Sequence, residues 1–245
     1  MTNSNHAVIP EAVLPASLDA DRRYNLDLHM HSTASDGALT PSDLVALCAQ
    51  RGLQHIALTD HDTMEGIEEA QNAAHQHGIG LLPGCELSTR WNGVGIHIVA
   101  LMPAGAQGVL VEGLVRQRQA RIERAVMIAE RLEKIGLPDA LAKARDQAGS
   151  ERPLGRPDFA RALIEAGIAK DWADAFKRYL GSGKKGDVKA QWPEVAEATE
   201  WVVASGGVAV IAHPLRYKLT RRLVAISKAV YCIYLPFHPP YEPQT

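Results

Sequence analysis

Apolar and polar residues alternate along the segment NLDLHMH, residues 25–31. Successive side chains of a β-strand point to opposite faces, so this alternation predicts a strand. The apolar side chains that would share one face are Leu26, Leu28 and Met30. The polar side chains that would share the other are Asp27, His29 and His31. Two imidazoles on one face of a strand can grip a single metal ion, although a strand with a polar outer face is the plainer interpretation.

Short apolar segments then alternate with segments of helical spacing. The predicted strands are HIALTDHD (55–62), IGLLPGCELS (79–88), GIHIVALM (95–102) and GGVAVIAHP (206–214). The predicted helices are TPSDLVALCAQRG (40–52), with Thr40 as N-cap, Pro41 in its first turn and Gly52 beyond its end, and TMEGIEEAQNAAHQHG (63–78). Residues 106 to about 180 also have helical spacing. Strand and helix in alternation predict an α/β fold with a parallel sheet covered by helices.

Composition narrows the class of protein. The chain has 245 residues, 46% of them hydrophobic, enough for the core of one domain, and its net charge of −2 gives no general attraction to nucleic acid or membranes. Its three cysteines are widely spaced, which indicates a reducing compartment rather than a disulfide framework. With no apolar run of membrane-spanning length and no secretion signal at the N-terminus, we expect a cytoplasmic protein without a membrane partner.

Histidine and carboxylate residues lie at or near the predicted strands. They are His29, His31, Asp36, His61, Glu86, His97 and His213. In a parallel α/β barrel the carboxyl ends of the strands meet at one face, so these side chains would converge. Imidazoles and carboxylates suit Zn, Mn or Fe, and seven candidates exceed the four ligands of one tetrahedral zinc. The pattern therefore predicts two or more divalent ions, a device for hydrolysing phosphate esters.

The motifs DLHMHSTASDG, ALTDHDT, GCELS and AHPLRY resemble those of the PHP (polymerase and histidinol phosphatase) family. The stretches GRPDFARAL and YLGSGKK are similar to the subgroup that contains nucleoside 3',5'-bisphosphate phosphatase and a 5'-to-3' exoribonuclease. The resemblance covers residues 24 to 218 approximately. It implies a distorted (β/α)7 barrel with two or three metal ions, most often Mn with Zn or Fe as alternatives, and a helical insertion over the site.

Carried over to this chain, the resemblance places all seven candidates on the family's metal-ligand positions, with Asp36, His61 and Glu86 as the catalytic residues. Asp60 is expected either to orient His61 or to cap a turn. The expected domains are a flexible tail at 1–23, the barrel at 24–105 and 190–245, and a helical insertion at 106–189.

A substrate with two phosphates needs cations beyond the metal ions. Arg118, Arg121 and Arg124 lie three residues apart in a predicted helix, and arginine matches phosphate oxygens in a bidentate manner. The candidate substrate-binding residues are Arg121, Arg124, Arg156 and Lys184. The alternative for any one arginine is a solvated face paired with Glu123 and Glu130.

Two features depart from the subgroup. Asp158 stands where GRPDFARAL generally carries His, and if that position faces the substrate an anion there would weaken phosphate binding. The late Asp-x-His motif has no good match, because Pro236 occupies the expected Asp position before Phe237 and His238. We therefore expect a C-terminus that is truncated, frame-shifted or diverged, an incomplete barrel and reduced activity.

The sequence thus predicts a metal-dependent phosphoesterase that acts on nucleoside 3',5'-bisphosphates or on 5' ends of short single-stranded RNA, with no obligate protein partner evident. Two alternatives stay open. One is a catalytically impaired, metal-binding fragment, which the missing last motif favours. The other is a different PHP activity, such as histidinol-phosphate hydrolysis.

Overall fold

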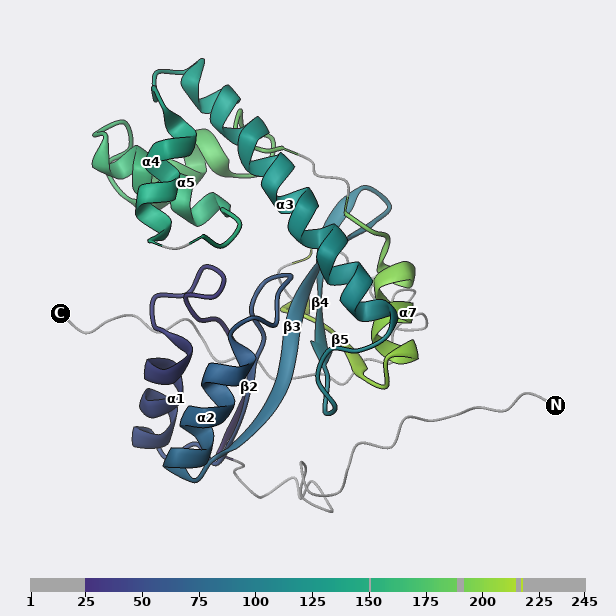
Figure 1. Cartoon of the computed structure of the whole chain (residues 1–245). Helices are drawn as coiled ribbons and strands as arrows, with labels where there is room; N and C mark the ends of the chain where they lie inside the picture. The colour runs from purple at the N-terminus through teal and green to yellow at the C-terminus, as the bar shows by residue number, and fades with distance from the viewer. Residues whose placement is uncertain (1–24, 150, 189–191, 215–216, 218–245) are drawn as a thin grey trace.

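A computed structural model of the chain describes residues 25–149, 151–188, 192–214 and 217 (Figure 1). The strands of its sheet are β1 (Leu26–Met30), β2 (His55–Leu58), β3 (Gly80–Trp91), β4 (Val94–Leu101) and β5 (Val208–Ile211). The helices that pack beside this sheet are α1 (Pro41–Gln50), α2 (Ile67–His77), the first half of α3 (Val109–Glu133) and α7 (Val195–Ala204). The remaining helices are α4 (Ala140–Ala148), α5 (Arg156–Glu165), α6 (Trp172–Ala175) and the π-helical turn η1 (Phe176–Leu180).

The sheet has the order β1-β2-β3-β4-β5 and is mixed rather than wholly parallel as predicted. β1, β2 and β3 run parallel, whereas β4 is antiparallel to both of its neighbours. The reason is a tight hairpin at Asn92 and Gly93, whose φ angles of 48° and 76° fit a type I′ turn. Asn-Gly is a strong hairpin signal. The described strands form a curled half-barrel, and the complete (β/α)7 barrel remains a prediction.

The simple alternation predicted for β1 is wrong. Leu28 packs with Val99 and Val210 on the inner face of the sheet, but Met30 packs in the cluster beneath α1 and α2, where Cys48 Sγ lies 3.4 Å from its sulfur. The register of β1 against β2 shifts between Asp27 and Met30. Such an irregularity re-aims the side chains that follow it.

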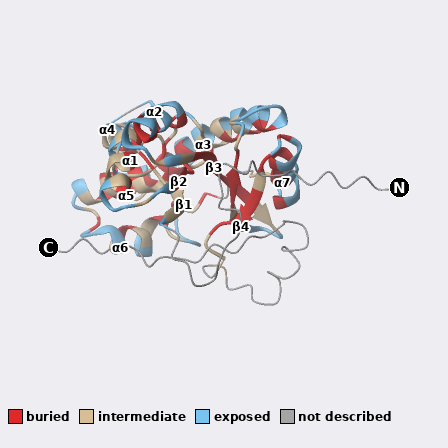
Figure 2. Ribbon diagram, turned by 90° about the horizontal axis from the view of Figure 1, so that it is seen from below, coloured by how far each residue is buried: buried red, intermediate tan, exposed pale blue. Residues whose placement is uncertain are grey.

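Helices cover the outer face of the sheet, and Figure 2 shows buried residues along β3 and β4. Thr40 caps α1 as predicted, since its side chain accepts a hydrogen bond from the backbone N–H of Asp43. α3 packs closely on α7, where a Cβ on Gly113 would lie 2.4 Å from the ring of Trp201. Only glycine permits this approach.

The second half of α3 leaves the sheet and enters a separate group of helices, here named the helical lobe (residues 125–188). Its core includes Ile128, Leu132, Phe159 and Leu163, all fully buried. In Figure 1 the lobe stands above the sheet, and α3 runs diagonally between the two. One long helix therefore joins the two hydrophobic cores and fixes the lobe over one end of the sheet.

The predicted tail at 1–23 and the atypical C-terminal segment with Pro236 and His238 lie outside the described residues. Within the part of the chain that is described, no helix has both the length and the apolar character needed to cross a membrane.

Candidate metal centre

The buried carboxylate of Glu86, on β3, lies at the centre of a group of histidines. Its Oε1 lies 2.8 Å from His97 Nδ1, 2.9 Å from His213 Nε2 and 3.6 Å from His29 Nε2. Its Oε2 lies 3.1 Å from His31 Nε2 and 3.2 Å from His61 Nδ1. Asp36 completes the group, because its two oxygens lie 3.8 Å from His31 Nδ1 and 3.8 Å from His61 Nε2. The fold therefore brings together all seven predicted ligand residues, here named the seven-residue cluster.

The cluster fits metal ions. Three sets of ligand atoms lie within 4.8 Å of one another: His29, Glu86 and His213; His31, Asp36 and His61; and His61, Glu86 and His97. Two residues, His61 and Glu86, belong to more than one set, which is the arrangement expected for neighbouring ions. Among the described residues, the buried Nδ1 atoms of His31, His61 and His213 have no hydrogen-bond partner. Buried nitrogens without partners are rare in folded proteins, and metal coordination would satisfy them.

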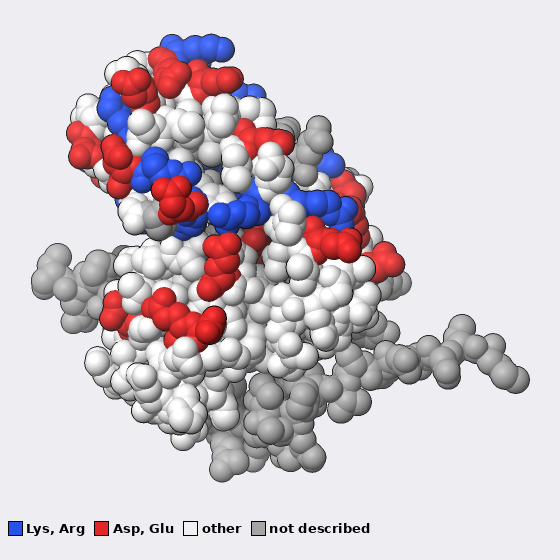
Figure 3. Space-filling view, viewed as in Figure 1, with Lys and Arg blue, Asp and Glu red and all other residues white. Residues whose placement is uncertain are grey.

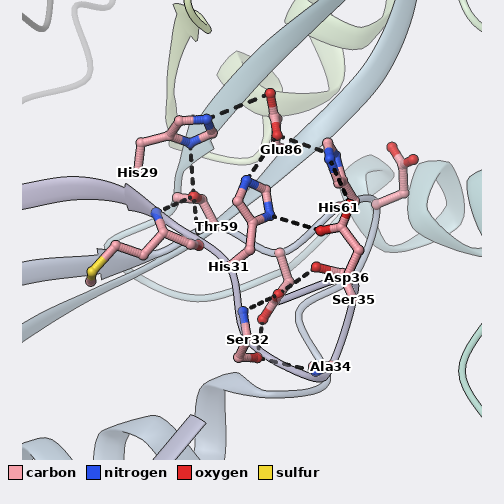
Figure 4. A network of polar contacts seen from close by, with 12 residues as sticks. His29, His31, Ser32, Ala34, Ser35, Asp36, Thr59, His61 and Glu86 are labelled. Atoms are coloured by element: carbon pink, nitrogen blue, oxygen red, sulfur yellow. Dashed lines mark hydrogen bonds and ion pairs between the residues drawn. The ribbon is translucent and has the colours of Figure 1, made fainter. Parts of the chain in front are cut away.

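The ring of His29 contacts the hydroxyl of Thr59 (Figure 4). The hydroxyl of Thr59 accepts a hydrogen bond from Met30 N and donates one to Met30 O. With its proton directed to Met30 O, Thr59 Oγ1 can accept a hydrogen bond at 2.9 Å from a protonated His29 Nδ1. His29 Nε2 then keeps its lone pair directed toward Glu86, as a metal ligand would require.

Burial sets the charge of these groups. It lowers the pKa of His29 to about 4 and that of His61 well below the usual range, so both rings are neutral at pH 7. Burial alone would raise the pKa of Glu86, but His61 and hydrogen bonds from the neighbouring imidazoles hold it well below its usual range. The centre therefore holds the neutral rings of His29 and His61 beside an ionised Glu86, and these are protonation states that bind divalent metals.

Asp60 acts on the loop after β1, as the turn-capping alternative predicts. It accepts hydrogen bonds from Ser32 N at 2.7 Å, Ser32 Oγ at 2.6 Å and Ser35 Oγ at 2.5 Å (Figure 4). These bonds anchor the loop that carries Asp36 to the end of β2. The position of Asp36 beside His31 and His61 follows from this anchor.

His97 reaches the cluster because β4 runs antiparallel. It lies opposite Ser88 and therefore on the same face of the sheet as Glu86, two residues along β3. In a parallel strand a residue so far from the carboxyl end would lie away from the site.

The predicted arginines lie between the cluster and the helical lobe, where basic side chains gather in Figure 3. Arg121 and Arg124 lie 5.7 and 5.9 Å from the ring of Trp192. Burial, with the nearby positive charges of Arg156 and Arg121, lowers the pKa of Arg124 to about 9. A buried arginine whose pKa is lowered by neighbouring cations favours an anionic ligand. Lys184 is exposed in the turn after η1.

Sequence reasoning missed the network that holds Arg121. The side chain of Asp62 accepts bonds from Arg121 Nε at 2.6 Å, Ser88 N at 2.6 Å and Gln117 Nε2 at 2.9 Å. Asp62 has a φ of 53°, which is uncommon outside glycine. Its place directly after His61, and the four-residue spacing of Gln117 and Arg121 on one helix face, were the available signals.

A cavity of about 300 Å³ opens beside Asp36 and His61. Its polar end also includes Arg121 and Arg152. The apolar side chains that line it are Met64, Ala106, Val111, Leu114 and Val115. The cavity thus extends from Asp36 and His61 of the seven-residue cluster to the first half of α3.

Asp158 is not among the residues that line the cavity, so the weakening of phosphate binding that an anion facing the substrate would cause is not expected. Asp158 is fully buried, and Arg152 donates two hydrogen bonds to its carboxylate, at 2.9 and 2.7 Å. Arg161 Nη1 donates a third at 3.0 Å, and the backbone N–H of Gly155 donates a fourth at 2.8 Å. The carboxylate is therefore neutralised within the lobe and caps the start of α5.

A curled α/β sheet with histidines and carboxylates converging beside a cavity is typical of metal-dependent hydrolases. A family model described as the PHP domain matches residues 27–145. The chain is 45% identical to a 5'-3' exoribonuclease from Haemophilus influenzae over 83% of this chain and 75% of that protein. It is 41% identical to a 3',5'-nucleoside bisphosphate phosphatase from Chromobacterium violaceum over 82% of this chain and 70% of that protein.

A solved structure of an amidohydrolase from Chromobacterium violaceum, with bound sulfate and no metal, superposes with a TM-score of 0.76. It is 41% identical and covers 82% of this chain and 70% of its own. The chain belongs to the PHP family, as its motifs predicted.

Proposed function

We propose that this chain is a metal-dependent phosphoesterase that hydrolyses phosphate from nucleoside 3',5'-bisphosphates, or nucleotides from the 5' end of short RNA. The observation that carries the proposal is the position of the buried arginines beside the seven-residue cluster. A hydrolytic centre and a group of cations at one cavity suit a substrate with more than one phosphate. The names of the relatives from Haemophilus influenzae and Chromobacterium violaceum support the same substrate class.

The seven-residue cluster would hold two or three divalent ions, with Mn as the proposed metal and Zn or Fe as alternatives. Such ions, when bound, supply an activated water and neutralise phosphate oxygens. His61 and Asp36 line the cavity and would face the scissile phosphate, whereas Glu86 is 1% exposed and would act through the ions that it binds. These three are the proposed catalytic residues.

Arg121 is the principal candidate for the non-scissile phosphate, since it lines the same cavity as His61. Its Nε is held by Asp62 and its Nη2 donates to Ser88 Oγ at 3.2 Å, so the guanidinium is oriented before substrate binds. Arg124, Arg156 and Lys184 are proposed to add positive charge behind it. The apolar end of the cavity, along α3, would receive the nucleoside.

The buried thiols of Cys48 and Cys85 form no disulfide. Because free thiols are typical of a reducing compartment, we propose the cytoplasm as the location of this protein.

The test is hydrolysis of adenosine 3',5'-bisphosphate by metal-free protein, with and without added Mn²⁺, and with His61→Ala as the control. We expect Mn-dependent phosphate release that the variant loses. Folded protein that binds Mn²⁺ but releases no phosphate would contradict the proposal and favour the impaired, metal-binding alternative.

A further inference from the structure

Arg152 is a buried cation without a role in the proposed reaction described above. It lies just before α5, its side chain is 6% exposed, and it lines the cavity that also contains Asp36, His61 and Arg121. Arg121 belongs to α3, whereas Arg152 belongs to the helical lobe. Arg121 and Arg152 therefore lie on different walls of one cavity. The same cavity includes Asp36 and His61 of the seven-residue cluster.

The hydrogen bonds of Arg152 leave one particular edge of its guanidinium unused. Nη1 donates to Asp158 Oδ2 at 2.9 Å and to the carbonyl of Pro153 at 3.2 Å, so both of its protons are committed. Nη2 donates one proton to Asp158 Oδ1 at 2.7 Å. Among the described residues, the buried Nε has no hydrogen-bond partner. What remains is the Nε–H and the second Nη2 proton, which together form the side-on fork that binds an oxyanion in a bidentate manner.

The charge balance around Arg152 also favours an anion. Asp158 is shared by two guanidinium groups, because Arg161 Nη1 donates to the same Oδ1 at 3.0 Å. The single carboxylate of Asp158 is thus shared by two cations, Arg152 and Arg161. Since Asp158 is fully buried, its negative charge is not presented to the cavity. A buried N–H without a partner costs stability, so an unused donor on a residue that lines the cavity favours an anionic ligand.

We propose that Arg152 is a substrate-binding residue that contacts a second phosphate of the nucleotide from the lobe side, opposite Arg121, and that Asp158 is the positioning residue that orients it. The inference rests on the proposed function and deepens it. It assigns to this chain a two-arginine clamp, one arginine from α3 and one from the lobe. Substrates with a single phosphate gain nothing from the second arginine.

The chain offers a matched control. Arg152 and Arg161 both donate to Asp158 Oδ1, but Arg161 is not among the residues that line the cavity, and its side chain is 32% exposed. Arg152→Gln and Arg161→Gln are compared in the full-length, Mn-loaded chain with adenosine 3',5'-bisphosphate and with 4-nitrophenyl phosphate. We expect Arg152→Gln to raise KM for the bisphosphate about tenfold or more, and Arg161→Gln to change it less than about twofold. KM for the aryl phosphate should change less than about threefold in both variants.

Loss of Arg152 leaves the buried carboxylate of Asp158 with one guanidinium partner, Arg161, so a second variant separates binding from folding. Arg152→Gln combined with Asp158→Asn removes both charges, and it should restore the melting temperature toward that of the parent while keeping the raised KM. Arg152→Lys keeps the charge without the fork, and it should recover only part of the affinity. A double variant with parental KM for the bisphosphate would overturn the proposal and leave Arg152 a structural role in the lobe.

If the proposed function itself is wrong, the result differs from the one that overturns the role of Arg152. Parent protein that cleaves 4-nitrophenyl phosphate but not the bisphosphate would contradict the substrate class. The two-arginine clamp is then tested by measuring, by calorimetry, the affinity of the same variants for adenosine 3',5'-bisphosphate. Affinity reduced about tenfold by Arg152→Gln but not by Arg161→Gln supports it, and equal affinities overturn it.

Discussion

Arg121 Nε donates a hydrogen bond to Asp62 Oδ2 across 2.6 Å, and this bond joins the proposed substrate-binding arginine to the residue that follows His61. The backbone N–H of Asp62 donates to Glu86 O at 3.0 Å. One aspartate therefore contacts both the arginine on α3 and the strand that carries the central carboxylate. The proposed metal centre and the proposed phosphate subsite therefore share Asp62 as a support.

Asp62→Asn tests this support. Asparagine tolerates a positive φ, so the backbone is kept while the charge opposite Arg121 is lost. We expect KM for the bisphosphate to rise about tenfold, because the guanidinium is less well oriented, with a smaller effect on aryl-phosphate hydrolysis. The free energy of unfolding, from urea titration, should fall by about 3 kcal/mol because the pair is buried. Arg118→Gln, which breaks an exposed pair with Glu65, should cost less than about 1 kcal/mol.

Reversing the charge of Arg121 addresses its role directly. Arg121→Glu should raise KM for adenosine 3',5'-bisphosphate by about 100-fold, since an attraction becomes a repulsion at a largely buried position. KM for 4-nitrophenyl phosphate should change much less. Steady-state kinetics with both substrates check this, and equal effects on the two would show that Arg121 does not recognise the second phosphate.

Glu86→Gln should disrupt the metal centre. The amide keeps the size of the side chain but removes the charge that five imidazoles surround, so bound metal per chain should fall and kcat should drop by about 100-fold or more. Elemental analysis of the purified variant and Mn-dependent rates give the two readouts. A variant with parental metal content would mean that Glu86 is not a ligand.

Metal binding should stabilise the folded chain. An ion present at 100 times its dissociation constant adds about 2.7 kcal/mol. For a domain of this size that corresponds to a rise in melting temperature of about 5 to 10 °C. Scanning calorimetry of metal-free protein with added Mn²⁺ measures it, and His61→Ala should show a smaller rise. Identical melting curves with and without Mn²⁺ would argue against the metal centre.

The apolar end of the cavity is a further target for mutation. Val115 on α3 lines the cavity, whereas Val126 on the same helix is also exposed but lies outside it. Val115→Asp should raise KM for the bisphosphate about tenfold through lost apolar contact and repulsion of phosphate, and Val126→Asp should leave it unchanged. Equal KM values for the two variants would place the nucleoside elsewhere.

Local rules were sufficient for much of the fold. The cap at Thr40, the strand segments and the helices flanking β2 depend on neighbouring residues, so they could be predicted from short stretches. Strand direction was predicted wrongly for β4, although Asn92 and Gly93 carry the turn that reverses the chain. The alternation rule failed in β1 because an irregular register against β2 separates Leu28 from Met30.

The chemistry of the site divides in the same way. The types and the order of the seven residues of the cluster are properties of the sequence, and their grouping was predicted from their places at or near strands. The roles of three other aspartates depend on tertiary contacts alone. Asp60 anchors a loop, Asp62 holds Arg121, and Asp158 is neutralised by Arg152. The physical reason is that the charge and role of a polar side chain depend on burial and on partners far along the chain. Such partners meet only when the sheet curls and α3 fixes the lobe beside it.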